Sequence, residues 1–168
     1  MANRLENATI VLVHGAWHSP EYFADLTAYL HDHCFTHVVT PSLPSTGPPV
    51  ALSNFDQDVF AVRETVRHVV EDQNEDCVLV MHSYGGVVGT EAVKGLRHRR
   101  KDGVGGGVIG MVYLTAFLLR EGESVGSNGV TPPSDPNEQP WFTVEVSLAL
   151  CFAICLPHPQ AYAGSPVS

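Results

Sequence analysis

The chain has 168 residues, of which 44% are hydrophobic and 16% are charged, and its formal net charge at pH 7 is -9. This length fits one domain, and the composition is typical of a soluble globular protein rather than a disordered or fibrous one. The negative charge argues against a nucleic-acid partner, because binding to a phosphate backbone requires clustered cations. The short basic run at residues 97–101 is expected to be a solvated loop.

Location and cofactor content are constrained mainly by what the sequence lacks. The first ten residues contain no apolar segment of a signal peptide, so we expect a cytoplasmic protein. The longest apolar stretch, at residues 144–156, is shorter than the ~18 residues that a membrane span needs. The four cysteines, Cys34, Cys77, Cys151 and Cys155, have no metal-binding spacing and are too few for a disulfide scaffold. We therefore expect mostly buried thiols, no metal and no cofactor.

The chain begins with a strand, a helix and a second strand. Thr9–Val13 is a β-branched apolar run, which predicts a strand buried on both faces, as in a parallel sheet. The segment from Ser19 to Glu21 combines an N-cap residue, a proline and an acidic residue, which together predict a helix start. This helix should end near His33, and residues 38–39 should form a second short strand.

A proline-rich loop at residues 41–49 leads to a second helix, predicted from Ser53 to about Asp72 with Asp56 in a weak capping box. Its core-facing residues should be Phe55, Val59, Val62, Val66, Val69 and Val70. The charged residues Asp58, Arg63, Glu64 and Arg67 should face away from the core.

A third strand is predicted at residues 77–81, a glycine-rich turn at 82–86, a helix from 87 to about 97, and a fourth strand at 108–114. Alternating strands and helices indicate an α/β fold, with a mostly parallel sheet flanked by helices. After residue 119 this periodicity ends, so we divide the chain into a core at 1–120 and a partial cap region and irregular tail at 121–168.

The strongest chemical signal is the run Met81-His82-Ser83-Tyr84-Gly85-Gly86 between a buried strand and a helix. A serine on such a turn projects at the carboxyl end of the sheet, and its neighbours must be small because the backbone is strained. Ser83 is therefore the candidate nucleophile, although Met81 replaces the first glycine of the G-x-S-x-G pattern. The alternative is a serine that merely starts a helix.

A second motif, His14-Gly15-Ala16-Trp17-His18, follows the first strand directly. An acyl-transfer transition state needs two hydrogen-bond donors aimed at one oxyanion. The amide of Tyr84, after the candidate nucleophile, can supply one, and the amide of Ala16 can supply the other, with Gly15 allowing close approach of the backbone.

These segments resemble the α/β-hydrolases, in particular the branch that includes hydroxynitrile lyases, plant methyl-ester esterases and many fungal proteins. The resemblance rests on residues 11–23, 41–45, 78–92 and 112–118. It implies that Ser83 is the nucleophile and that the amides of Ala16 and Tyr84 form an oxyanion hole. The residues expected to support this site are His14, Gly15, Trp17, His18, His82 and Gly85.

The resemblance also implies a catalytic Asp and His after further strands, in the order Ser, Asp, His. No segment after Leu118 matches those strands, so the chain is interpreted as truncated, with the acid and base unassigned. His82 and His158 are poor substitutes for the base, and Asp102 and Asp135 are expected to be solvated loop residues. Loss of the base should lower turnover by roughly 10⁴ to 10⁶.

Two interpretations of the C-terminal tail remain open. Either residues 144–168 derive from an unspliced or frameshifted reading and were not selected to fold, which we favour, or they form a helix in which Leu148, Cys151 and Cys155 pack over the sheet. In the first case the fourth strand would be an exposed apolar edge.

Two classes of function remain. The leading one is a serine hydrolase that acts on a small ester or related carbonyl substrate, and the resemblance leaves hydrolysis and lyase chemistry both open. The other is a non-catalytic protein that binds a small ligand or a partner between the HGAWH and HSYGG segments. A nucleotide-binding role for the glycines at 103–107 fails, because they precede a strand instead of following one.

Overall fold

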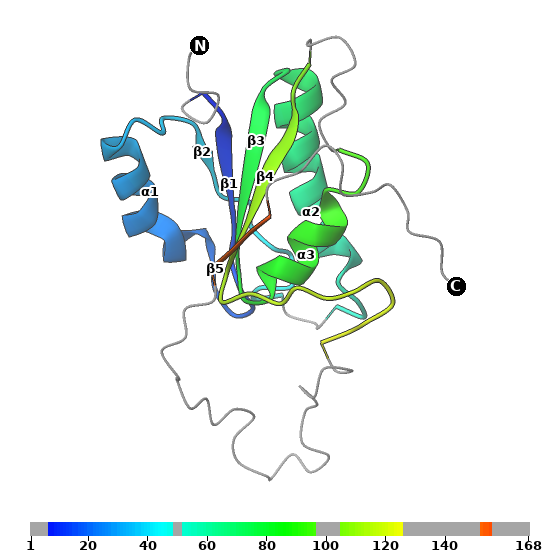
Figure 1. Cartoon of the computed structure of the whole chain (residues 1–168). Helices are drawn as coiled ribbons and strands as arrows, with labels where there is room; N and C mark the ends of the chain where they lie inside the picture. Colours follow the sequence, from blue (N-terminus) through cyan, green and yellow to red (C-terminus); the bar gives the residue numbers. More distant parts are fainter. Residues whose placement is uncertain (1–6, 49–51, 97–104, 126–151, 156–168) are drawn as a thin grey trace.

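The computed structural model describes residues 7–48, 52–96, 105–125 and 152–155 (Figure 1). Its centre is a sheet with the strand order β2-β1-β3-β4-β5. Four of these strands are parallel: β1 (Thr9–Val13), β2 (Val38–Val39), β3 (Asp76–His82) and β4 (Gly107–Leu114). The predicted α/β class and its parallel sheet are therefore confirmed.

The fifth strand, β5 (Phe152–Cys155), pairs antiparallel with residues 111–114 of β4. Neither interpretation of the tail anticipated this strand. The predicted helix is wrong at Cys155, which lies in β5, and the predicted exposed edge is wrong for residues 111–114 of β4, which pair with β5. An edge strand presents unpaired amides and carbonyls, and a short run of apolar β-forming residues can satisfy them by pairing. Leu148, Cys151 and His158 lie outside the described residues.

The helices occur where the sequence predicted them, with shifted ends. A 3-10 turn (Pro20–Phe23) precedes α1 (Ala24–Asp32), although the Ser19 side chain forms no capping hydrogen bond. α2 (Asp56–Arg67) continues into a π-helical turn (His68–Asp72). α3 (Gly85–Ala92) begins two residues earlier than expected and ends sooner.

The start of α2 was misplaced because the predicted capping box does not form. The Oδ1 of Asn54 accepts a hydrogen bond from the Asp56 amide at 3.2 Å, so Asn54 organises the first turn in place of Ser53. Phe55, expected in the core, is exposed.

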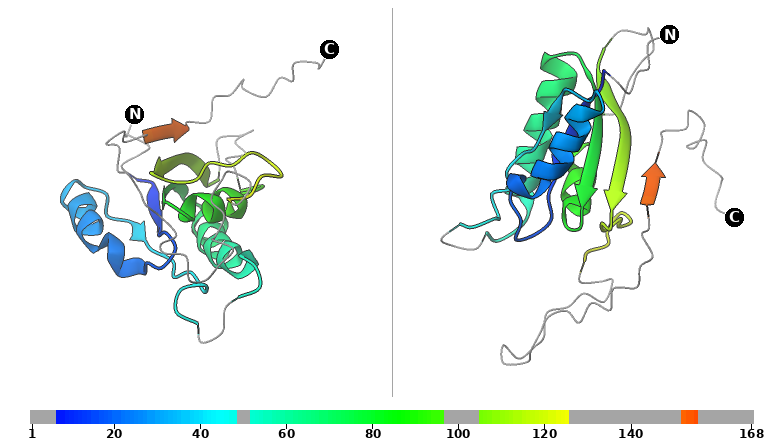
Figure 2. Two further views of the ribbon diagram at one scale, coloured as in Figure 1. Left: turned by 90° about the horizontal axis from the view of Figure 1, so that it is seen from below. Right: turned by 90° about the vertical axis from the view of Figure 1, so that its left-hand side faces the viewer.

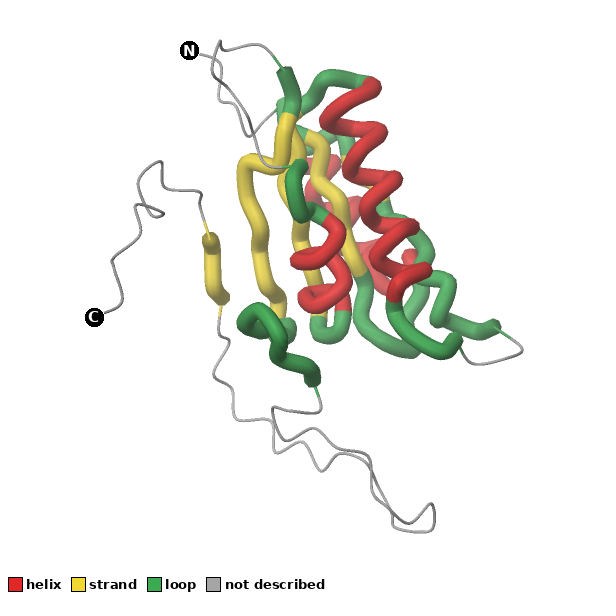
Figure 3. Tube along the Cα trace, turned by 90° about the vertical axis from the view of Figure 1, so that its right-hand side faces the viewer, coloured by secondary structure: helices red, strands yellow, loops and turns green. Residues whose placement is uncertain are grey.

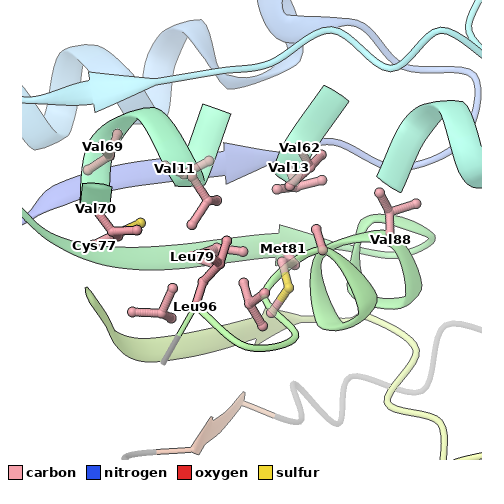
Figure 4. Close-up of a cluster of buried hydrophobic side chains, with 14 of the residues drawn as sticks. Val11, Val13, Val62, Val69, Val70, Cys77, Leu79, Met81, Val88 and Leu96 are labelled. Carbon is pink, nitrogen blue, oxygen red and sulfur yellow. The ribbon is translucent and has the colours of Figure 1, made fainter. Parts of the chain in front are cut away.

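Helices cover both faces of the sheet (Figure 2). Strand residues alternate between two apolar clusters, because successive side chains of a strand point to opposite faces. On β1, Ile10 and Leu12 pack toward α1, whereas Val11 and Val13 pack toward α2 and α3. The larger cluster also contains Leu79 and Met81 of β3, Val62 and Val66 of α2, and Val88 of α3 (Figure 4).

Two charged residues of α2 contradict the expectation that they face solvent. Asp58 is fully buried, and Arg63 reaches the end of α3, where its Nη1 donates to the carbonyls of Ala92 (2.9 Å) and Lys94 (2.7 Å). These carbonyls lack partners within the helix, so the guanidinium caps the C-terminal end of α3. Glu64 and Arg67 agree better with the prediction, because they form a partly exposed ion pair at 3.2 Å.

Among the cysteines, Cys77 is buried as expected, whereas Cys34 is exposed at the end of α1, where its φ of 71° lies in the left-handed region. Within the described ranges, no helix is long and apolar enough to cross a membrane.

Candidate active site

The strand register gathers the predicted site residues at one end of the sheet. Val13 of β1 lies opposite Met81 of β3, and His82 of β3 lies opposite Leu114 of β4. Since these strands are parallel, the loops that follow them emerge at the same carboxyl edge, where α3 also begins (Figures 1 and 3). The HGAWH and HSYGG segments are therefore neighbours in space although they are distant in the chain.

Ser83 lies on a sharp turn between β3 and α3. Its φ is 52°, in the left-handed region that residues other than glycine rarely adopt, so the turn stores backbone strain. Two hydrogen bonds hold this conformation: the Ser83 amide donates to the Leu114 carbonyl at 3.3 Å, and the Phe117 amide donates to the Ser83 carbonyl at 3.1 Å. The strained serine is thus fixed by the loop that follows β4.

The two glycines after Tyr84 are needed because backbone passes directly beside them. A Cβ atom on Gly85 would lie 2.5 Å from the Val13 carbonyl oxygen, and one on Gly86 would lie 2.4 Å from the Phe117 carbonyl oxygen. Neither oxygen can move without displacing a strand or its loop. These glycines let α3 start close to the ends of β1 and β4.

The loop after β1 touches the turn directly. A Cβ atom on Gly15 would lie 3.1 Å from the Ser83 Cβ and 3.0 Å from the His82 Nδ1, so a larger residue would crowd the candidate nucleophile. Trp17, in the same loop, has a φ of 61° and is 81% exposed, which places its apolar ring at the protein surface.

His14 fixes the same loop from inside the protein. Its buried ring accepts a hydrogen bond at Nε2 from the Leu43 amide (3.3 Å) and lies with Nδ1 2.9 Å from the Gly15 carbonyl oxygen. Because Nε2 is an acceptor, the proton of the neutral ring is on Nδ1, which donates to Gly15. His14 therefore connects the loop after β1 to the proline-rich loop.

The amides of Ala16 and Tyr84 are available as donors. Neither amide donates a hydrogen bond to another residue in the described parts of the chain. Tyr84 is also the N-cap of α3, so its amide lies at the positive end of the helix dipole. An anion formed beside Ser83 would be stabilised by such groups.

Three rings form a cluster next to Ser83. Tyr22 stacks on His82 with ring centroids 5.1 Å apart, and His18 meets both rings edge-on, at 4.2 Å from Tyr22 and 5.5 Å from His82. The His18 Nδ1 lies 2.8 Å from the Ala16 carbonyl oxygen, so this ring also orders the loop. Burial, with a smaller contribution from His18, lowers the pKa of His82. His82 therefore favours its neutral form, and it packs against Tyr22.

Sequence reasoning missed Asp58. Its Oδ1 accepts a hydrogen bond from the Ser45 amide and its Oδ2 accepts one from the Tyr84 hydroxyl, both at 2.8 Å. Burial and the neighbouring Asp58 raise the pKa of Tyr84, which keeps the hydroxyl protonated as the donor. The spacing in the sequence could have predicted its burial, because Asp58 precedes the buried Val62 by four residues and so lies on the same face of α2.

In the described ranges, no side chain forms a hydrogen bond with the Ser83 hydroxyl, so the structure identifies no partner for its proton there. Asp102, Asp135 and His158 lie outside these ranges, and their expected roles stay predictions. The described residues contain no cluster of His, Cys, Asp or Glu suited to hold a metal ion.

Comparisons with known proteins assign the family. A profile described as the alpha/beta hydrolase family matches residues 10–164. An alpha/beta hydrolase of Aspergillus novofumigatus is 33% identical over 141 residues, which are 84% of this chain and 55% of that protein. A carbendazim-hydrolysing esterase of a Nocardioides species is 31% identical over 119 residues, covering 70% of this chain and 46% of the esterase.

A solved structure shares the fold. An extracellular α/β-hydrolase from a Paenibacillus species, described as structurally and functionally homologous to tobacco salicylic acid binding protein 2, superimposes with a TM-score of 0.55 at 23% identity. The match covers 76% of this chain and 47% of that structure. The chain thus spans about half the length of the relatives it matches. With both the profile and the fold in agreement, the chain belongs to the α/β hydrolase family.

Proposed function

We propose that this protein is a serine hydrolase that acts on a small ester or a related carbonyl compound through an acyl-enzyme on Ser83. The observation that carries the proposal is the strained turn at Ser83, where the φ of 52° combines with glycines that no larger residue can replace without a backbone clash. Strained backbone conformations cluster at active sites. The name of the Nocardioides relative favours an ester as the substrate class.

In the proposed mechanism, the Ser83 Oγ attacks the ester carbonyl carbon, its hydroxyl proton leaves, and the carbonyl oxygen becomes an oxyanion. Collapse of the oxyanion breaks the bond to the alcohol oxygen, the alcohol departs with a proton, and water then hydrolyses the acyl group from Ser83. The amides of Ala16 and Tyr84 donate hydrogen bonds to this oxyanion, and the helix dipole of α3 adds to its stabilisation. Loss of one such donor typically lowers kcat by about 10²- to 10³-fold. Gly15 leaves room for the substrate, because any side chain at this position would contact Ser83.

A fluorophosphonate probe tests the proposal directly, since it forms a covalent bond with an activated serine. We expect the purified chain to be labelled and the Ser83→Ala variant to remain unlabelled, with mass spectrometry locating the adduct on Ser83. Ser53→Ala is the matched control, because Ser53 is exposed and lies outside the site. A folded wild-type chain that is not labelled, or labelling that persists in Ser83→Ala, would refute the proposal.

The alternative is a non-catalytic protein that binds a small ligand at the same edge of the sheet. One observation favours it: in the described part of the chain no side chain is bonded to the Ser83 hydroxyl to take up its proton. Small esters would then raise the melting temperature of both wild type and Ser83→Ala without any ester cleavage. Cleavage that depends on Ser83 would exclude this alternative.

A further inference from the structure

The carboxylate of Asp58 is buried and forms no ion pair with any described residue. The proposed mechanism gives this carboxylate no role. It is completely inaccessible and accepts two hydrogen bonds of 2.8 Å. It also lies in the first turn of α2, where the helix dipole favours a negative charge. A buried carboxylate is costly unless its oxygens are satisfied, and each of these contacts satisfies one of the two oxygens.

The two partners of this carboxylate belong to different parts of the site. The Ser45 amide is in the proline-rich loop, which the Leu43 amide connects to His14 in the loop after β1. The Tyr84 hydroxyl belongs to the residue directly after Ser83, which caps α3 and whose carbonyl accepts bonds from the amides of Val87 and Val88. Tyr84 is therefore held at both ends: its main chain by α3 and its ring by Asp58.

We propose that Asp58 is a positioning residue, which holds Tyr84 through its hydroxyl so that the Tyr84 amide stays directed at the oxyanion beside Ser83. This inference rests on the proposed function. An oxyanion donor is effective only when it lies within about 2.7–3.1 Å of the developing charge. A displacement of about 1 Å can lower a rate 10²-fold, so an anchor at the far end of the Tyr84 ring affects reactivity without touching the substrate.

Arg63 provides a matched comparison, because it joins the same two helices at the other end of α3. Its Nη1 donates to the carbonyls of Ala92 and Lys94, far along the helix from Ser83. Arg63→Met should lower stability by removing this link, but it should leave the Tyr84 amide in place. If Asp58 acted only by holding α2 against α3, Asp58 and Arg63 variants would behave alike.

The experiment measures the rate of fluorophosphonate labelling of the full chain as a function of probe concentration, so that binding and the chemical step are separated. We expect Asp58→Ala to slow the limiting rate about tenfold or more, with little change in the half-saturating probe concentration. Tyr84→Phe removes only the hydroxyl and should slow the same step by a smaller factor. Asp58→Asn can accept from Ser45 and donate to the Tyr84 oxygen, so it should recover most of the rate.

The possible outcomes separate the two proposals. Limiting rates of Asp58→Ala and Tyr84→Phe within twofold of Arg63→Met, with wild type labelled at Ser83, would overturn the positioning role and leave the proposed function intact. If Asp58→Ala does not fold, Tyr84→Phe decides, because its loss of one hydroxyl leaves the carboxylate bonded to Ser45. A folded wild-type chain without Ser83 labelling would overturn both proposals.

Discussion

Replacing Gly85 with alanine tests whether the close approach of α3 to β1 shapes the site. The new Cβ would lie 2.5 Å from the Val13 carbonyl oxygen and 2.8 Å from the His14 carbonyl oxygen. Cβ atoms essentially never approach closer than 3.0 Å, so the start of α3 would have to retreat by at least 0.5 Å from the main chain of β1. Both obstacles are backbone atoms, and a change of rotamer cannot relieve them.

Overpacking of this kind typically costs about 1–3 kcal/mol. Alanine recovers up to about 1 kcal/mol of helix propensity relative to glycine. We therefore expect Gly85→Ala to lose about 1–2 kcal/mol of unfolding free energy, or about 2–8 °C in melting temperature for a chain of this size. The retreat of α3 should also slow labelling of Ser83 about tenfold.

Urea unfolding and calorimetry measure the change, and Gly110→Ala is the control. A Cβ atom on Gly110 would meet only the Val78 side chain at 3.7 Å, an ordinary contact, so this variant should be neutral or slightly stabilising. A Gly85→Ala protein as stable and as reactive as Gly110→Ala would refute the argument that backbone contact selects glycine at this position.

Three further predictions concern buried and titratable groups. His14→Phe removes both hydrogen bonds of a buried ring, so the urea midpoint should fall by an amount equivalent to about 1–3 kcal/mol, and an unchanged midpoint would contradict the linking role. Burial raises the pKa of Cys77 to about 12, whereas Cys34 is exposed. Iodoacetamide at pH 8 should therefore modify Cys34 in the native chain and Cys77 only after unfolding, which peptide mapping measures. Burial lowers the pKa of His82 below its ordinary value of 6.5, so the unfolded chain takes up this proton at a higher pH than the folded chain. The contribution of His82 to folding stability is therefore complete above pH 6.5 and is lost as the pH falls through the lowered pKa. His82→Gln should flatten the decline in melting temperature in acid, and identical melting profiles of the variant and wild type would exclude this linkage.

The centre of the sheet was predictable because β1 and most of β3 are short apolar runs that are buried on both faces. Thr9–Val13 is buried at every position and was predicted with its observed bounds. The turn at Ser83 was equally visible, since two adjacent glycines between a strand and a helix have few other uses. The parallel order then brought the loops after β1 and β3 to one edge without any further information.

Asp58 and β5 were missed because local sequence does not determine their partners. Charge placed Asp58 on the solvent side of α2, yet its spacing from Val62 and Val66 put it on the buried stripe, and a tyrosine hydroxyl from a distant turn satisfied it. In β5, Phe152–Cys155 has no turn or periodicity that marks a strand, and it is defined only by pairing with β4. Both misses concern long-range hydrogen bonds, which composition and periodicity do not encode.

The hydrogen bonds around Ser83 imply that covalent capture and turnover can be separated in this chain. The turn is fixed by main-chain bonds to Leu114 and Phe117, and the donors proposed for the oxyanion are main-chain amides. Proton transfer instead requires a base that reaches the Ser83 hydroxyl, and no described side chain forms a hydrogen bond with it. Enzymes stripped of their triad retain roughly 10³- to 10⁴-fold acceleration over water from such amides and from binding. We therefore expect slow, Ser83-dependent phosphonylation together with little ester turnover; turnover as fast as labelling would show that a base reaches Ser83 from outside the described ranges.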